Sequence, residues 1–440
     1  MAARSNAHSP TTGASGPSRR SARRSRPRDS GAAPFTGRVR SARPAAATAS
    51  SGPAIAASRA RGGLRTSWPS AERPFNCFES MRVRMVAARP GERVFAHIIR
   101  RMVRPTLLAS EVTAAHARVA ARLSDELEQV ERIFDEQLVS DLPEVNELCR
   151  HIERYRGKML RPSLMLLSGM AVRGEGIHDA VTERHRMIGA VVEMIHMATL
   201  VHDDVLDEAD IRRQGRTVNS LRGNETAVIL GDYLISNAFH LCSRAGEPWI
   251  NLELGEVTNT LCEGELVQLS HRDDLSLDEG RYFEIVRRKT ASLVAACCRI
   301  GARLAGANEA LSREMGDFGQ DVGVAFQIQD DLLDLEGRPD VVGKSLGIDL
   351  AKGKLTLPVI LHLGSANAEP RRREAALSLV RGRDVAGLLA AMRGSGALER
   401  ARERAMDLVA RARARLSLLP PGPAREFLAE AAASVVRRES

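Results

Sequence analysis

The stretch VEMIHMATLVHDDVLD, residues 192–207, decides how this sequence is interpreted, and its D-D-x-x-D ending recurs in FQIQDDLLD, residues 326–334. On a helix, residues four apart lie on the same face, so each motif directs a pair of carboxylates in one direction. These pairs are Asp203 with Asp207 and Asp330 with Asp334. Each pair can therefore hold a hard cation.

The apolar surroundings of the two motifs carry an electrostatic cost. Like charges four residues apart destabilise a helix, and the flanking residues are apolar enough to place both turns against a core. Magnesium offsets this cost because it prefers a few carboxylates, several waters and substrate phosphate oxygens around an octahedron. A single such motif is more simply explained as a solvated acidic face. Two copies in apolar settings favour a metal site instead.

A third aspartate-rich segment, RDDLSLDEG at residues 272–280, serves as a control. Its surroundings are polar, so nothing in them requires a cation to offset a cost of burial. Ser276 and Glu279 have the spacing of a capping box, which predicts that this segment begins the next helix. We therefore predict no metal site there.

The composition favours an all-helical fold. Of the 440 residues, 43% are hydrophobic but only 3% are aromatic, and Ala, Leu, Val and Arg dominate, which suits helices better than sheets. Helical periodicity begins within Ala115–Val139, with apolar residues at Val119, Leu123, Leu127, Val130 and Ile133. Turn signals follow at residues 141–143, 173–176, 222–224, 246–248, 337–339 and 420–423. No strand alternation of useful length occurs, so we predict one helical domain over residues 105–440.

The positive charge of the chain is concentrated at its beginning. The formal charge is +9 overall, but residues 1–104 contain 21 Arg, no Lys and 4 acids, a net of +17, which leaves −8 for residues 105–440. An acidic body lacks the basic surface of a nucleic-acid-binding domain, so we predict no nucleic-acid partner. Residues 1–80, rich in Arg, Ser, Ala and Pro, are predicted to be a disordered tail.

Two interpretations of this tail remain open. An Arg- and Ser-rich, acid-poor N-terminus is typical of an organelle transit peptide. Alternatively, translation begins at Met81, Met85 or Met102 and the upstream residues have no function. We favour the second interpretation because the tail lacks a clear amphipathic stretch. We therefore expect a cytoplasmic protein, with organelle targeting as the minor alternative.

The cysteine pattern indicates a reducing compartment. The cysteines form no C-x-x-C pair and lie in apolar, helix-like contexts, so we predict buried free thiols. They are Cys77, Cys149, Cys242, Cys262, Cys297 and Cys298. No run of 18 or more apolar residues occurs, so no transmembrane segment is predicted.

Basic residues cluster around both acidic motifs at turn-like positions. Lys158 and Arg161 lie three apart, on one face if the segment is helical. Arg212 and Arg213 follow the first motif within ten residues, close enough to meet the same ligand. After the second motif, two lysines follow glycines, which let the backbone approach a ligand closely. These pairs are Gly343-Lys344 and Gly353-Lys354. One exposed cation is usually only solvated, but this clustering indicates a polyanionic ligand.

Together these motifs make the chain similar to the trans-type polyprenyl diphosphate synthases, from about residue 105 to residue 363 and more loosely to the C-terminus. The shared motifs are Gly157-Lys158-x-x-Arg161-Pro162, Asp203–Asp207 with Arg212-Arg213, Gly231–Leu234, Gly264–Gln268, Lys289-Thr290, Phe326–Asp334, Gly343-Lys344 and Gly353–Pro358. The resemblance implies the all-α isoprenoid synthase fold, a single large helical domain with a central cavity between helices. It also implies head-to-tail condensation of isopentenyl diphosphate with an allylic diphosphate, by a homodimer.

The resemblance further implies roles for individual residues. Asp203, Asp207 and Asp330 would bind magnesium, three ions in all. The residues that would support them are Asp204, Asp331 and Asp334. Those implied to contact the allylic diphosphate are Arg212, Lys289, Thr290, Gln327, Lys344 and Lys354. Lys289 and the six aspartates of the two motifs are also assigned to catalysis. Those implied to hold isopentenyl diphosphate are Lys158, Arg161, His196 and Arg213.

One departure from the family pattern lies in the loop after the first motif. The family usually has glycine directly after the two arginines, whereas Gln214 separates Arg213 from Gly215 in this chain. We expect the loop to absorb the extra residue, although it affects the placement of Arg213.

The expected reaction is a stepwise ionisation and condensation. The allylic C–O bond breaks to a carbocation once the leaving diphosphate is neutralised, and the isopentenyl double bond then attacks, so no nucleophilic Ser or Cys is required. Ala198 and Thr199 lie one turn before Asp203, and both are small, so the growing chain should pass them. By resemblance we expect a product of roughly C30 to C50 for a quinone side chain, with geranylgeranyl diphosphate as the alternative. Met194 or Ile195 would form a deeper floor.

Other functions fit the residues less well. A terpene cyclase shares the first motif but usually replaces the second with an Asn/Ser/Glu triad, whereas this chain keeps its aspartates at residues 330–334. The motif at residues 157–162 disfavours a head-to-head squalene or phytoene synthase. A noncatalytic subunit of a heteromeric synthase would tend to lack motif aspartates or basic residues, and none is missing.

We also expect loose membrane association through the product.

Overall fold

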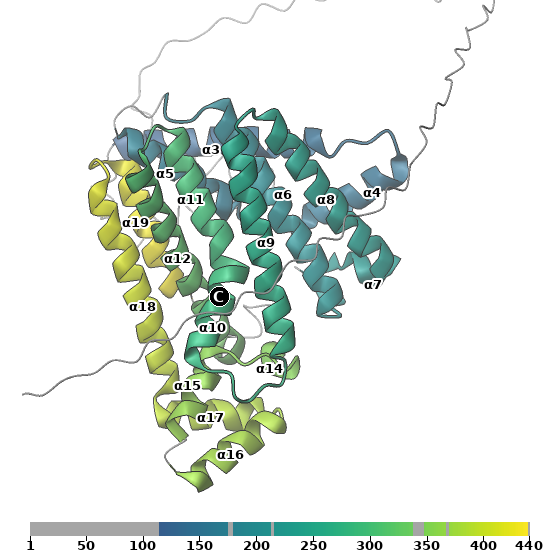
Figure 1. The fold of residues 1–440 in the computed structure, drawn as a ribbon, viewed down its shortest axis with the longest axis vertical. Coiled ribbons are helices and arrows are strands. Elements are labelled where there is room, and N and C mark those ends of the chain that lie inside the picture. Colours follow the sequence, from purple (N-terminus) through teal and green to yellow (C-terminus); the bar gives the residue numbers. More distant parts are fainter. Residues whose placement is uncertain (1–113, 175–178, 213–214, 338–346, 367–368, 439–440) are drawn as a thin grey trace, which may run out of the picture. The chain divides into compact units, whose positions relative to one another are not determined.

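The computed structural model describes residues 114–174, 179–212, 215–337, 347–366 and 369–438 (Figure 1). The elements up to the second motif are α3 (Ala114–Gln137), α4 (Pro143–Ile152), η1 (Glu153–Tyr155), α5 (Leu160–Arg173), α6 (Glu183–Leu206), β1 (Ile211–Arg212), β2 (Gly215–Arg216), α7 (Val218–Arg222), α8 (Asn224–Arg244), α9 (Pro248–Ser270), α10 (Glu279–Val286), η3 (Arg287–Ala291), α11 (Ser292–Leu304) and α12 (Glu309–Glu336). They are followed by α14 (Ile348–Ala351), α15 (Leu357–Ala366), α16 (Pro370–Arg381), α17 (Val385–Ser395), α18 (Ala397–Arg415), η4 (Leu416–Leu418) and α19 (Pro423–Val436).

The turn signals in the sequence coincide with helix ends. Proline occupies the first turn of α4, α9 and α19, where its missing N–H removes no helical hydrogen bond. The long helix α12 begins after Asn308, whose side chain accepts a hydrogen bond from the Leu311 N–H at 2.9 Å, and it ends before Gly337. The first predicted helix is α3, and its buried apolar residues include Val119, Leu123, Leu127 and Val130, whereas Ile133 is half-buried.

The all-α prediction is confirmed, with one small exception after the first motif. Strands β1 and β2 pair antiparallel, with Ile211 opposite Arg216 and Arg212 opposite Gly215. The two residues that connect them, which include the extra glutamine predicted to be absorbed by the loop, lie outside the described residues. Because the hairpin follows α6 directly, it holds Arg212 close to the first motif.

Helix α11 packs against both α5 and α12, and glycines allow these helices to approach closely. A Cβ atom on Gly301 would lie 2.1 Å from the Met165 carbonyl oxygen of α5. A Cβ atom on Gly319 of α12 would lie 2.6 Å from the Val294 carbonyl oxygen of α11. Separations this short are not tolerated in packed interiors, so only glycine fits these two crossings.

Replacing Gly301 with alanine should destabilise the fold. The added methyl group would overlap a backbone oxygen, which cannot rotate away as a side chain can. Overpacking costs about 1–3 kcal/mol, against about 1 kcal/mol that alanine gains over glycine within a helix. The loss should appear as a lower midpoint in urea unfolding. In α15, a Cβ atom on Gly364 meets nothing within 4 Å, so Gly364→Ala is the matched control and should leave the midpoint unchanged or raise it. Equal shifts in both variants would contradict this packing role.

The helices that carry the two aspartate motifs are α6 and α12, and each motif lies in the last turns of its helix. Helix α14 and the turn after it contact both motifs, because the backbone of Asp349 hydrogen-bonds Asp334 and the side chain of Lys354 bonds Asp207. Two motifs 127 positions apart in sequence therefore border the same region.

Two details of the sequence prediction need correction. The capping box at Ser276 and Glu279 is wrong: α10 begins at Glu279, but its N-cap is Asp278, whose side chain accepts from the Arg281 N–H at 2.8 Å. Cys262 is exposed rather than buried, because it lies on a face of α9 that the core does not cover. The other described cysteines are buried and free, as predicted: Cys149, Cys242, Cys297 and Cys298.

Some predictions concern residues that the structure does not describe. The predicted tail at residues 1–80 and the thiol of Cys77 are among them. Of the helices that are described, none is long and apolar enough to cross a membrane.

Candidate active site

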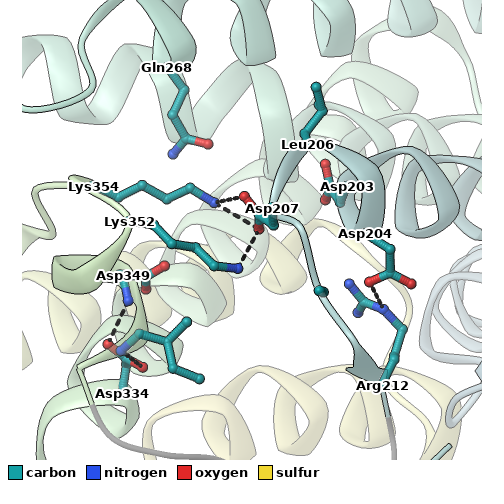
Figure 2. A network of polar contacts seen from close by, with 12 residues as sticks. Asp203, Asp204, Leu206, Asp207, Arg212, Gln268, Asp334, Asp349, Lys352 and Lys354 are labelled. Atoms are coloured by element: carbon teal, nitrogen blue, oxygen red, sulfur yellow. Dashed lines mark hydrogen bonds and ion pairs between the residues drawn. The ribbon is translucent and has the colours of Figure 1, made fainter. Parts of the chain in front are cut away.

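The aspartates of the first motif leave the end of α6 in different directions (Figure 2). Asp204 is almost fully buried and points toward Arg212, whose Nε donates to its Oδ1 at 2.7 Å. Asp207 follows the last residue of α6 and points toward the lysines of the turn after α14. The Asp207 carboxylate lies close enough to Asp203 to add to the rise in pKa that burial causes there. Asp204 is thus held by the hairpin, and the other two aspartates border the site.

Three cations surround the carboxylate of Asp207. Lys354 Nζ lies 2.9 Å from Oδ1 and 3.0 Å from Oδ2, and Lys352 Nζ lies 3.3 Å from Oδ2. Arg272 Nη2 donates to Oδ1 at 3.4 Å. Burial alone would raise the pKa of Asp207, but Lys354, and after it Lys352, hold that pKa below its usual value. The carboxylate is therefore ionised and fully partnered.

Lys289 approaches the first motif from η3, a π-helical turn of the kind found often at functional sites. Its Nζ donates to Gln268 Oε1 at 2.9 Å, pairs with Glu265 and lies 3.7 Å from Asp203 Oδ1. Gly264 allows α9 to approach η3 closely, since a Cβ atom there would lie 2.7 Å from the backbone nitrogen of Lys289. Burial raises the pKa of Asp203, and the Lys289 ammonium opposes that rise.

Asp331 is buried at the centre of a hydrogen-bond network. It accepts from the Tyr282 hydroxyl at 2.6 Å, from Gln327 Nε2 at 3.1 Å and from the Leu357 N–H at 3.3 Å. Thr290 Oγ1 in turn donates to Gln327 Oε1 at 3.1 Å. Burial raises the pKa of Asp331 to about 7. This aspartate ties α10, α12 and α15 together and fixes the Gln327 amide.

The other two aspartates of the second motif have separate partners. Asp334 caps α14: its Oδ1 accepts from the Ile348 N–H at 3.1 Å and its Oδ2 from the Asp349 N–H at 3.3 Å. Asp330 Oδ1 accepts from Arg438 Nη1 at 2.8 Å, near the C-terminus. Asp331 and Asp334 therefore support the surrounding structure, whereas Asp330, half-buried like Asp334, is paired with the Arg438 guanidinium.

The donor set of the site suits magnesium. The predicted ligands Asp203, Asp207 and Asp330 are all carboxylates, which are hard ligands, and magnesium usually takes only one or two of them together with water and phosphate oxygens. Among the residues with described positions, no three acidic, histidine or cysteine side chains form a group that could hold a metal ion. A magnesium ion held by these carboxylates would take its remaining ligands from water and a bound phosphate.

Comparison with known proteins links this geometry to a family. The Polyprenyl synthetase family matches residues 142–389 of the chain. The chain belongs to this family. It is 36% identical over 307 residues to the octaprenyl diphosphate synthase of Escherichia coli (strain K12), an alignment that covers 69% of this chain and 93% of that relative.

Solved structures agree with this membership of the polyprenyl synthetase family. A decaprenyl diphosphate synthase from Rhodobacter capsulatus has a TM-score of 0.67 at 34% identity, covering 74% of this chain and 99% of that chain. A polyprenyl synthase from Caulobacter crescentus CB15, complexed with calcium and isoprenyl diphosphate, also has a TM-score of 0.67, at 31% identity, covering 74% of this chain and 98% of that chain.

The residues that the family pattern assigns to isopentenyl diphosphate lie at the start of α5 and on α6. Lys158 is exposed just before α5, Arg161 is half-buried in its first turn and His196 is half-buried on α6. Burial lowers the pKa of Arg161, and the buried Glu193 of α6 opposes that change. The predicted ligand-binding residues outside the described ranges are Arg213 and Lys344.

The residues predicted to set product length lie in the middle of α6. Ala198, Met194 and Ile195 have no exposed surface. Thr199 is half-buried, and its hydroxyl donates to the His196 carbonyl oxygen at 2.7 Å, which directs it back along the helix. That these residues set the length of the product of this chain stays a prediction.

Several residues of the site were missed by sequence reasoning. Arg272 lies in the polar segment at residues 272–280, where no site is predicted, and Lys352 follows an alanine rather than a glycine, two residues before the predicted Lys354. Tyr282 is one of only 3 tyrosines in the chain, a weak signal for a buried hydroxyl donor. Arg438 carries no sequence signal, because its contact with Asp330 spans 108 positions.

Proposed function

We propose that this member of the polyprenyl synthetase family is a magnesium-dependent prenyltransferase. It would condense isopentenyl diphosphate with an allylic diphosphate, head to tail, to form a new double bond of trans geometry. The observation that carries the proposal is the contact of Lys354 with Asp207. Lys354 belongs to the turn after α14, and Asp334 of the second motif caps α14. The contact therefore brings two carboxylate motifs and several cations to one place, as a metal and diphosphate site requires.

The described side chains can bind and neutralise the leaving group. Lys289 and Lys354, with Arg212, would donate hydrogen bonds to the allylic diphosphate as charge develops on it. Gln327, whose amide is fixed between Thr290 and Asp331, would orient the same group. Bound magnesium, three ions in this proposal, would add positive charge at the diphosphate oxygens.

The second substrate would be held on the other side of the site. Lys158, Arg161 and His196, with Arg213, would bind isopentenyl diphosphate and aim its double bond at the allylic carbon. The apolar residues of α6 and α12 would keep water away from the carbocation, and the proton lost afterwards would pass to the departing diphosphate.

The proposed product is a polyprenyl diphosphate of roughly C30 to C50, of the type used for quinone side chains. The small residues Ala198 and Thr199 and the similarity to enzymes named octaprenyl and decaprenyl diphosphate synthase support this length. Geranylgeranyl diphosphate is the alternative product.

We further propose a homodimer in the cytoplasm, with loose membrane association through the product. Helices α8 and α9 expose large apolar side chains, and an oligomeric contact would cover them. These are Ile229 at 66%, Leu252 at 67% and Leu266 at 66% exposure. The buried free cysteines support a reducing compartment.

Incubation of the full chain with isopentenyl diphosphate, magnesium and a farnesyl or geranylgeranyl primer tests this function. Chromatography of the dephosphorylated products should show chains of roughly C30 to C50, and a chelator should abolish them. Products that stop at C20 would support the alternative, and cyclised hydrocarbon would indicate a cyclase. No incorporation at all would favour a noncatalytic subunit. Deleting residues 1–80 should leave the activity unchanged.

A further inference from the structure

The carboxylate of Asp207 has more cationic partners than a metal-binding aspartate can keep. Lys354 contacts both oxygens, Arg272 adds a donor to Oδ1 and Lys352 lies near Oδ2. A carboxylate has about four lone-pair sites, so coordination of an ion requires some of these donors to leave. Lys352 at 3.3 Å and Arg272 at 3.4 Å are more distant than Lys354, and are the partners most easily displaced.

The backbone that carries both lysines is fixed in place. Gly353 lies between them with φ of +71°, and a Cβ atom there would lie 2.5 Å from Asp273 Oδ1. The Asp273 N–H donates to the Gly353 carbonyl oxygen at 2.8 Å, and the Lys354 N–H donates to the Asp349 carbonyl oxygen at 2.9 Å. Asp273 directly follows Arg272, so one contact positions all three cations. Their side chains can move while their Cα atoms stay near Asp207.

We propose that Lys352 and Arg272 are exchangeable cations of the first motif, which neutralise Asp207 in the free enzyme and bind the allylic diphosphate once a divalent ion takes that carboxylate. The inference rests on the proposed function and adds two residues to its diphosphate site. When an ion displaces them, the incoming diphosphate would supply acceptor oxygens for both cations. Arg272 can offer two parallel N–H donors to its oxygens, and Lys352 a single ammonium.

This role predicts opposite effects on two binding equilibria. In Lys352→Gln and Arg272→Gln, a competing positive charge is removed from Asp207, so Mn²⁺ alone should bind more tightly, by about 3-fold. Farnesyl thiodiphosphate, a non-reacting allylic probe, should bind about 10-fold more weakly in the presence of Mg²⁺, because a charged hydrogen bond is lost. Electron paramagnetic resonance of free Mn²⁺ and isothermal titration calorimetry measure the two dissociation constants.

Matched variants separate this role from a merely structural one. Arg383 lies 3.9 Å from Asp273 Oδ1 and its side chain is 55% exposed, so it borders the same turn without contacting Asp207. Arg383→Gln should therefore leave both constants unchanged. Lys352→Arg keeps the charge and should restore binding of the thiodiphosphate. Weaker binding of both probes in the Gln variants, or no change in either, would overturn the proposal.

The proposed function and this inference fail in different experiments. If the wild-type chain does not elongate a primer with isopentenyl diphosphate, the proposed function fails. If the wild type elongates the primer but the Gln variants bind Mn²⁺ and thiodiphosphate as it does, only the exchange of Lys352 and Arg272 is rejected. Circular dichroism of each variant confirms that the compared proteins are folded.

Discussion

Replacing Asp203 or Asp330 with alanine is expected to lower the rate of isopentenyl diphosphate incorporation by about 1,000-fold, because each variant loses a carboxylate that would anchor an ion on the leaving diphosphate. Several kcal/mol of transition-state stabilisation correspond to a factor of this size. The fold should persist. In Asp203→Ala, Lys289 keeps Gln268 and Glu265 as partners, so no buried charge is left alone.

The control for this prediction is another carboxylate of α12. Asp317 pairs with Arg415, and its side chain is 46% exposed, so Asp317→Ala removes a negative charge at a distance from the motif. Steady-state incorporation of labelled isopentenyl diphosphate, at saturating substrate and magnesium, should give near wild-type rates for Asp317→Ala. Near wild-type rates in Asp203→Ala or Asp330→Ala would reject the metal assignment.

The helical fold could be predicted from sequence because its signals are local. Proline and glycine mark the helix ends, and apolar residues recur at helical spacing along α3. The packing of those helices could not be predicted, because it depends on which glycine meets which backbone. Gly301 and Met165 are 136 positions apart in sequence, and no local sequence feature at either residue predicts their contact.

The candidate site divides in the same way. Spacing pairs Asp203 with Asp207 and, in the same way, Asp330 with Asp334. In the second motif the two carboxylates have separate partners, because α12 ends next to α14. Asp334 is drawn to the free N–H groups of that helix, whose sequence position gives no hint of the contact. The polar surroundings of Arg272 give no signal of its contact with Asp207, which lies 65 positions away in sequence. Sequence patterns predicted Lys354 beside the first motif but not Arg272 or Lys352, since long cations reach their partners across the fold.

The length of the product is expected to change in opposite directions when two residues of α6 are altered. In Ala198→Phe, a large ring would fill the level one turn below Asp203 and stop elongation, so short products of about C15 to C20 should replace the long ones. In Met194→Ala, one turn deeper, the floor would be removed and products should lengthen. Both residues are fully buried, so the incubations should be run at a temperature where circular dichroism shows folded protein, before the products are separated by chromatography.

Overpacking alone must be separated from a blocked path, because adding a ring to a full core costs about 1–3 kcal/mol wherever it is placed. Ala405 of α18 is also fully buried, and Ala405→Phe should lower stability without shortening the product. If Ala198→Phe shortened the product only as much as Ala405→Phe, the change would follow from a loosened fold. If Ala198→Phe left the product distribution unchanged, the growing chain would not pass that face of α6, and the small side chains before Asp203 would have no bearing on chain length.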